Sequence, residues 1–221
     1  MGTFSLEQKD NLVWLGRYTE RVFTTIKFYF TGYDRMIDTD THYYAEFCEK
    51  LDIPNIYQSK EDFLARYPFA EENSDSIYSN LIRAYNNGIV LREEIGSEAL
   101  AYIQLAIYGM QKASVSAAPL IELQKVMDNL LAFWGAIDDG IENEHVRNLI
   151  KCGKRIERLD LYSRLEMPVL MMQKEVSRLA HRIKTTGVNY EKTVMSQLGS
   201  MMSADTLDYD KVVREIEKLA V

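Results

Sequence analysis

Proline, glycine and cysteine are scarce in this sequence of 221 residues, which contains 4 Pro, 11 Gly and 2 Cys. Because proline and glycine interrupt regular elements and mark turns, their scarcity leaves long stretches without a strong break. The two cysteines, Cys48 and Cys152, lie far apart and form no CxxC pair or Cys/His cluster. A disulfide framework and a structural zinc site are therefore not indicated, and we expect both thiols to be small buried side chains.

The sequence also lacks long apolar runs and an excess of basic residues. No run of about 18 apolar residues is present, and the N-terminal MGTFSLEQKD has no apolar signal-peptide core, so we expect a cytoplasmic protein without a membrane span. The 26 Lys and Arg residues are outnumbered by 33 Asp and Glu, for a formal net charge of −7. Broad binding to nucleic acid or to an anionic membrane requires a basic surface, so neither is an expected partner.

What is present throughout is apolar residues at spacings of three and four, the pattern of an all-helical protein. Hydrophobic residues make up 47% of the chain and charged residues 27%, which are ordinary globular values, and no low-complexity linker divides it. We therefore expect one helical bundle, a single domain over residues 1–221. Its first helix, ending at about Ile37, is apolar on more than one side, which is typical of a central helix.

Helix ends are predicted from capping and turn residues. Ser59 is the expected N-cap of a short helix, and Ser74 or Asp75 is the expected N-cap of the helix that follows it. Ser97 should restart or bend that helix, and Gly109 should end the next one.

One charged hexapeptide occurs twice. GRYTER at Gly16–Arg21 returns as GKRIER at Gly153–Arg158, an offset of 153 − 16 = 137 residues. The match pairs three charged positions: Arg17 with Lys154, Glu20 with Glu157, and Arg21 with Arg158. At about 100° per residue, the charged positions of each copy fall in one sector of a helix, beside an apolar stripe.

Charges beside a buried stripe must be paired, because an uncompensated buried charge costs several kcal/mol. If the two motif helices pack together, each glutamate can accept hydrogen bonds from an arginine of the other copy. We expect a polar centre that either fixes the register of two pseudo-equivalent central helices or binds an anionic or peptide ligand. Its candidate residues are Arg17, Glu20, Arg21, Asn87, Arg92, Lys154, Glu157 and Arg158.

Metal and cofactor sites are not expected. Glu142 and His145 have the Glu-x-x-His spacing of di-iron helical bundles, but such a site needs a second copy of that motif, and the sequence has none. A metal-dependent enzyme that uses Glu142 and His145 stays a third, minor alternative. No Gly-rich phosphate loop, GxSxG elbow or Cys/His dyad has usable spacing, which favours a protein that is not an enzyme.

Three ordered blocks support a family resemblance. WLGRYTER near the start, the central NNGIVLREEIGSE, and LLAFWGAIDDGIEN followed by KCGKRIERLD resemble the alpha-E domain, a bacterial all-helical family named for its Glu-Arg motif. Its second motif usually reads GRxxER, whereas Lys154 stands here in place of that arginine. Lysine keeps the charge but lacks the planar fork that permits bidentate hydrogen bonds.

The resemblance implies a role in a multi-protein system, although the family has no assigned activity. Genes of such proteins commonly neighbour ATP-grasp-like ligases and transglutaminase-like proteins. The resemblance therefore implies an accessory or scaffold protein of a peptide- or amide-bond modification system, with one of those proteins as its partner. The alternative is an enzyme that binds an anionic or peptide substrate between the two motifs, with Glu20 or Glu157 as acid or base.

Overall fold

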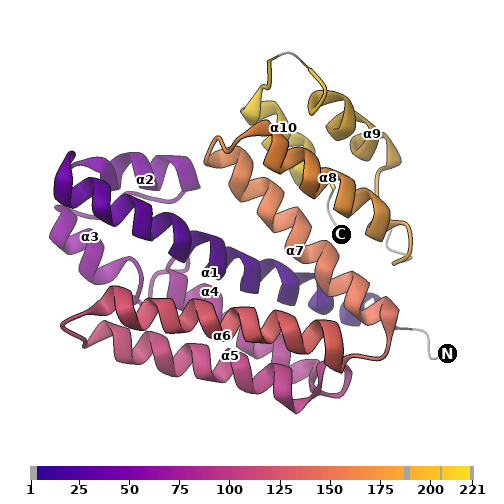
Figure 1. Cartoon of the computed structure of the whole chain (residues 1–221), viewed down its shortest axis with the longest axis horizontal. Coiled ribbons are helices and arrows are strands. Elements are labelled where there is room, and N and C mark those ends of the chain that lie inside the picture. The colour runs from indigo at the N-terminus through magenta and orange to yellow at the C-terminus, as the bar shows by residue number, and fades with distance from the viewer. Residues whose placement is uncertain (1–3, 187–189, 205, 220–221) are drawn as a thin grey trace. The chain divides into compact units, whose positions relative to one another are not determined.

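The computed structural model describes residues 4–186, 190–204 and 206–219, and in these ranges every regular element is an α-helix (Figure 1). The all-helical class is thus confirmed. The helices are α1 (Leu6–Asp38), α2 (Tyr43–Leu51), α3 (Lys60–Arg66), α4 (Ile77–Val90), α5 (Arg92–Ser114), α6 (Pro119–Gly140), α7 (Glu144–Arg164), α8 (Val169–Ile183), α9 (Lys192–Met201) and α10 (Tyr209–Glu217). Among the described residues, no helix is both long enough and apolar enough to cross a membrane.

The chain divides into two compact units. Unit 1 comprises Met1–Glu20 and Asn143–Val221, and unit 2 comprises Arg21–Glu142. Helix α1 therefore begins in unit 1 and ends in unit 2. The single domain over residues 1–221 stays a prediction.

In unit 1, helix α7 packs against α8 and α10. Thirteen residues form its apolar core: Cys152, Ile156, Leu159, Met172, Val176, Leu179, Ile183, Val194, Leu198, Met202, Val212, Ile216 and Leu219. Cys152 belongs to this core and Cys48 is buried in unit 2, so the prediction of two buried free thiols is confirmed. Burial raises the pKa of each thiol to about 12.

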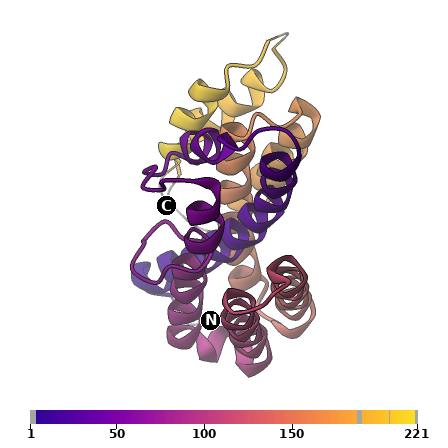
Figure 2. The ribbon, with the colours of Figure 1, turned by 90° about the vertical axis from the view of Figure 1, so that its left-hand side faces the viewer.

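In unit 2, α5 and α6 form an antiparallel pair, seen from two sides in Figures 1 and 2. Gly109 does not end α5, contrary to the sequence prediction, because the helix continues to Ser114. The glycine serves close packing instead: a Cβ at Gly109 would lie 2.9 Å from Val126 Cγ2 of α6. The predicted bend beside Ser97 is present at Gly96, whose φ of 80° interrupts the helical backbone.

Two N-cap predictions have different outcomes. Ser59 caps α3 as expected, and its side chain accepts a hydrogen bond from Asp62 N at 3.2 Å. The prediction of Ser74 or Asp75 as the cap of α4 is wrong, because the cap is Ser76, whose side chain accepts from the backbone N of Ser79 at 3.0 Å. Several serines and acids precede this helix in sequence, and only the backbone conformation selects among them.

Candidate functional site

The two copies of the repeated motif lie on α1 and α7. GRYTER occupies the middle of α1, and GKRIER occupies the middle of α7. All of the second copy and the first five residues of the first copy belong to unit 1, and Arg21 belongs to unit 2.

The glycines that begin the two copies allow the helix backbones to touch. A Cβ placed at Gly16 would lie 1.9 Å from the carbonyl oxygen of Ile150, and a Cβ placed at Gly153 would lie 1.9 Å from that of Val13. Each glycine therefore faces the residue three positions before the other glycine. No side chain fits at either position without a shift of the backbone.

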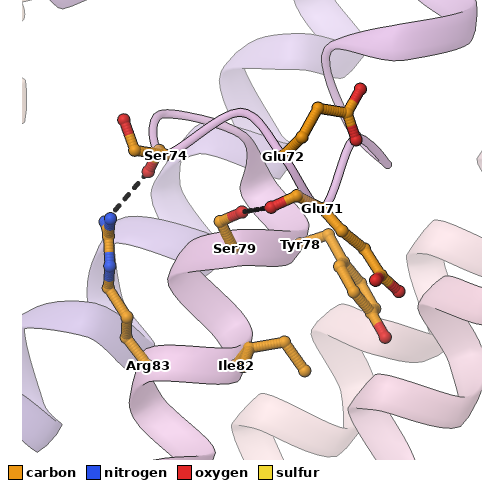
Figure 3. A pocket seen from close by; sticks show the side chains of 7 residues that line it. All are labelled: Glu71, Glu72, Ser74, Tyr78, Ser79, Ile82 and Arg83. Carbon is orange, nitrogen blue, oxygen red and sulfur yellow. Dashed lines mark hydrogen bonds between the residues drawn. The ribbon is translucent and has the colours of Figure 1, made fainter.

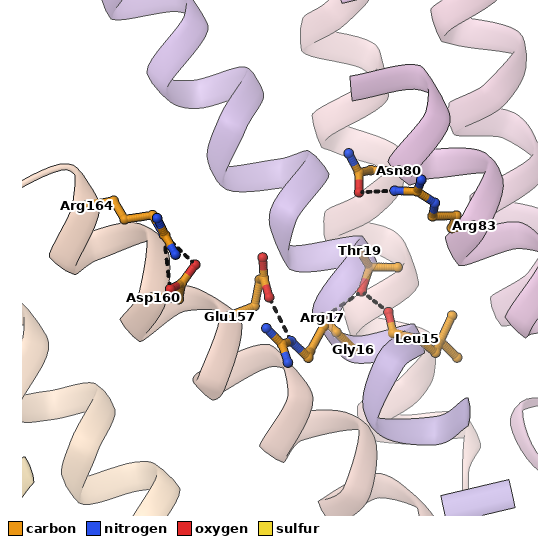
Figure 4. A network of polar contacts seen from close by, with 9 residues as sticks. All are labelled: Leu15, Gly16, Arg17, Thr19, Asn80, Arg83, Glu157, Asp160 and Arg164. Carbon is orange, nitrogen blue, oxygen red and sulfur yellow. Dashed lines mark hydrogen bonds and ion pairs between the residues drawn. The ribbon is translucent and has the colours of Figure 1, made fainter. Parts of the chain in front are cut away.

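Each motif glutamate accepts a hydrogen bond from an arginine of the other copy. Arg17 Nε donates to Glu157 Oε2 at 2.8 Å (Figure 4), and Arg158 Nε donates to Glu20 Oε1 at 2.6 Å. Glu20 is 0% exposed and Glu157 is 1% exposed, so both carboxylates are buried. Burial removes water from the ion pairs, which makes each pair strong and also makes the loss of one partner costly.

Lys154 is the counterpart of Arg17 in the second copy, and it is partly buried. Burial lowers the pKa of its ammonium group to about 7, although the Glu20 carboxylate opposes the shift. Arg158, Arg155 and Lys151 repel the charged ammonium and lower the pKa further. Lys154 is therefore a cation that can lose its proton near neutral pH, which an arginine at the same place could not do.

The other three candidate residues belong to unit 2. Arg92 is exposed at the start of α5, and its Nε and Nη2 atoms donate to Ser97 Oγ at 3.3 Å. Arg21 and Asn87 are partly buried. Burial raises the pKa of Tyr67 well above its usual value, and the positive charge of Arg21 opposes this shift.

A buried carboxylate that was not among the predicted site residues extends the network in unit 1. Glu175 of α8 accepts from Arg155 Nη1 at 2.5 Å and from Arg178 Nη1 at 2.9 Å, and it lies 3.7 Å from Arg158 Nη1. The sequence did contain a signal, because Glu175 is three residues after Met172 and four before Leu179, on the buried face of α8. An acid in an apolar stripe needs a cationic partner.

A cavity of about 190 Å³ opens beside Arg17 in unit 1. Its lining includes Val13, Trp14, Arg17, Ile156, Asp160 and Glu217. The guanidinium carbon of Arg17 lies 4.4 Å from the centre of the Trp14 ring, a cation–π contact that orients the arginine at the cavity wall. Asp160 accepts from Arg164 Nε through both carboxylate oxygens at 3.1 Å (Figure 4).

A second hollow, of about 490 Å³, lies in unit 2 at the start of α4 (Figure 3). Its lining includes Glu71, Glu72, Ser74, Tyr78, Ile82 and Arg83. Arg83 Nη1 donates to the Ser74 carbonyl at 2.9 Å, so the guanidinium fixes the loop that borders the hollow. None of the predicted site residues lines it.

No group of three or more His, Cys, Asp or Glu side chains in the described ranges could hold a metal ion. His145 instead stacks on Phe4, with ring centres 5.6 Å apart, and its Nδ1 lies 3.4 Å from the Thr185 carbonyl. Asn143 caps α7 by accepting from the backbone N of His145 at 3.0 Å. These contacts give the segment around His145 a structural explanation.

Comparison with known proteins agrees with the repeated motif. The model of the Alpha-E family, described as a predicted alpha-helical domain with a conserved ER motif, matches residues 8–206. No curated protein and no solved structure matches the chain. The match includes both copies of the motif and residues of both units, and the chain therefore belongs to the Alpha-E family.

Proposed function

We propose that this chain is an accessory or scaffold protein of a peptide- or amide-bond modification system, and that its Glu-Arg centre holds the fold. One observation supports this most directly: Glu20 and Glu157 are both buried, and each accepts from an arginine of the other copy. A catalytic acid or base must reach its substrate within hydrogen-bond distance. Buried carboxylates that are held by arginine are poorly suited to that task.

In this proposal α1 and α7 act as pseudo-equivalent central helices. The reciprocal contacts of Gly16 and Gly153 support it, because each glycine lies against the same position of the other copy. Two such contacts on one helix pair fix both the distance and the register of the helices. The Glu-Arg pairs then act as a register lock, a use of buried polar groups that is well attested in helical assemblies.

The proposed partner is an ATP-grasp-like ligase or a transglutaminase-like protein, as the family resemblance implies. Exposed apolar side chains support a protein partner, since large apolar groups outside the core are common at contact surfaces. Leu105 and Tyr108 are exposed one turn apart on α5. Leu170 on α8 is also exposed and serves as a matched control.

The test is co-purification of the tagged chain with the product of a neighbouring gene of either type, at native expression. We expect a complex with the wild-type chain and a loss of that complex when Leu105 and Tyr108 are both replaced by Asp. Leu170→Asp should retain the complex. If the wild-type chain captures neither type of partner, the scaffold proposal is wrong.

The cavity beside Arg17 favours a second candidate, an enzyme that binds an anionic or peptide substrate at the motif. Arg17 could hold a substrate carboxylate at the wall while Glu20 or Glu157 acts as acid or base. For such an enzyme, Glu20→Gln would keep the melting temperature and remove activity or ligand binding. A scaffold instead predicts a large fall in melting temperature with no effect on ligand binding.

A further inference from the structure

The buried carboxylate of Glu175 is surrounded by arginines from two helices of unit 1. Arg155 and Arg158 approach it from α7, and Arg178 approaches it from its own helix, α8. The Glu175 side chain is only 5% exposed, whereas that of Arg178 is 54% exposed. The cluster therefore has a buried acid at its base and a cationic rim that solvent reaches.

A fourth arginine lies at the same face. Arg182, one turn after Arg178 on α8, donates from Nη1 to Asn148 Oδ1 of α7 at 2.8 Å. Burial lowers the pKa of Lys151, and repulsion from Arg182 and Arg155 lowers it further. Arg182 thus lies on the same face of α8 as Arg178, and its hydrogen bond to Asn148 directs it toward α7.

The four arginines carry more positive charge than their acids neutralise. Arg155, Arg158, Arg178 and Arg182 supply four positive charges against the two negative charges of Glu175 and Glu20, and Lys151, which Arg155 and Arg182 repel, adds a further positive charge. Burial lowers the pKa of the Arg155 guanidinium, and the Glu175 carboxylate opposes this shift. Repulsion from Arg158 and Arg178 lowers the pKa further. A bound anion would relieve this repulsion.

Hydrogen-bond donors are also in excess. A guanidinium group has five N–H donors. In the described part of the chain, each of the four arginines makes one side-chain hydrogen bond: to Glu175 from Arg155 and Arg178, to Glu20 from Arg158, and to Asn148 from Arg182. The Nε atom of Arg155 is buried and has no hydrogen-bond partner among the described residues.

We propose that these four arginines on α7 and α8 form a binding site for a phosphate group, either free or as a phosphate ester. A phosphate dianion would offset two of the surplus positive charges, and its oxygens can accept from guanidinium groups on both helices at once. Lysine-only clusters bind phosphate as point charges, whereas arginine forks fix its orientation. The site is independent of the proposed scaffold function.

Isothermal titration calorimetry of the full chain with inorganic phosphate and with diphosphate tests the site, with ionic strength held constant by NaCl. A second arm compares AMP with adenosine, which separates a phosphate ester from the free ion. We expect saturable binding of diphosphate. AMP binding tighter than inorganic phosphate assigns the site to esters, and equal or weaker binding assigns it to the free ion. Heat no greater than that of NaCl in both arms overturns the proposal.

Removal of a rim charge should lower the affinity for diphosphate. Arg178→Gln should weaken diphosphate binding by about threefold to tenfold, because it removes one rim charge. Arg66→Gln is the matched control, since Arg66 is 47% exposed and pairs with Asp62 at 3.2 Å within one helix. Equal affinity of the Arg178 and Arg66 variants would reject the site.

Glu175→Gln should bind diphosphate about threefold to tenfold more tightly, because it removes a competing negative charge. Its melting temperature in chloride should fall, and diphosphate should restore part of the loss. Weaker binding by a folded Glu175→Gln variant would contradict the proposal. If that variant does not fold, the comparison of Arg178→Gln with Arg66→Gln still decides the question.

Discussion

The close approach of α1 and α7 predicts that Gly16→Ala destabilises the protein. In an uncrowded helix this substitution stabilises by up to about 1 kcal/mol, because alanine is the better helix former. Here the added Cβ would lie 1.9 Å from the Ile150 carbonyl oxygen, and ordinary contacts begin at 3.4 Å. The helix backbones must therefore move apart by about 1.5 Å at this point.

The cost follows from what that movement disturbs. Overpacking of this kind costs about 1 to 3 kcal/mol. The same movement lengthens the Arg17–Glu157 and Arg158–Glu20 hydrogen bonds, now 2.8 and 2.6 Å, and a weakened buried charged pair adds about 1 to 3 kcal/mol. After the gain in helix propensity of up to about 1 kcal/mol, we expect a net loss of about 1 to 5 kcal/mol, or about 2 to 20 °C in melting temperature for a chain of this size.

Urea and thermal unfolding followed by far-UV circular dichroism measure this loss. Gly153→Ala should give a similar value, since its Cβ would lie 1.9 Å from the Val13 carbonyl oxygen. Gly199→Ala in α9 is the control, because no described residue outside the local helix backbone comes within 4 Å of its added Cβ, and it should be neutral or slightly stabilising. Equal stability of the Gly16 and Gly199 variants would refute the reasoning.

Burial lowers the pKa of Lys154 to about 7 from a model-compound value of 10.5. Between these pH values Lys154 binds a proton in the unfolded chain but not in the folded one, so the free energy of unfolding should rise with pH. Relative to the Lys154→Met variant, the rise should be up to about 1.4 kcal/mol per pH unit in urea titrations at pH 7 to 10. Burial raises the pKa of Cys48 and Cys152 to about 12, so neither thiol should react with iodoacetamide at pH 8 until denaturant is added, as mass spectrometry would show. Glu20→Gln and Arg158→Gln should each destabilise by about 3 kcal/mol, with a coupling energy of at least about 1 kcal/mol in a double-mutant cycle; additive effects would mean that the pair does not act as a unit.

The helical class and the exchange of arginines between motif copies follow from spacing and repetition. The close approach at Gly16 and Gly153 does not, because a glycine in a helical pattern is usually judged only as a weak break. The signal was nevertheless in the repeat, since both copies begin with glycine. The prediction that Gly109 ends a helix is wrong for the same reason. This glycine allows close contact with Val126, and that contact depends on tertiary packing.

Charged residues in mid-helix present the same difficulty. A single carboxylate such as Glu175 is usually solvated, and only its position on the apolar face of α8 indicates burial. Its partner Arg178 follows from the i, i+3 spacing within α8, but Arg155 and Arg158 come from α7, about 20 residues earlier in the chain, and helical spacing within one element cannot predict them. Arg92 was a predicted member of the polar centre, yet it is exposed and donates a hydrogen bond to Ser97, five residues later in the chain.

The two motif copies also differ in the charges around them. At the offset of the repeat, Lys151 and Arg155 of the second copy stand where the first has Trp14 and Tyr18. The second copy thus has two additional cations, and they repel a charge at Lys154. An arginine there would stay charged at every physiological pH, whereas lysine can release its proton. We infer that a lysine at position 154 avoids repulsion from the arginines around Glu175, because it can release its proton. Lys154→Arg should therefore lower the stability of the wild-type chain. It should lower stability less in an Arg155→Tyr background, which has the tyrosine of the first copy.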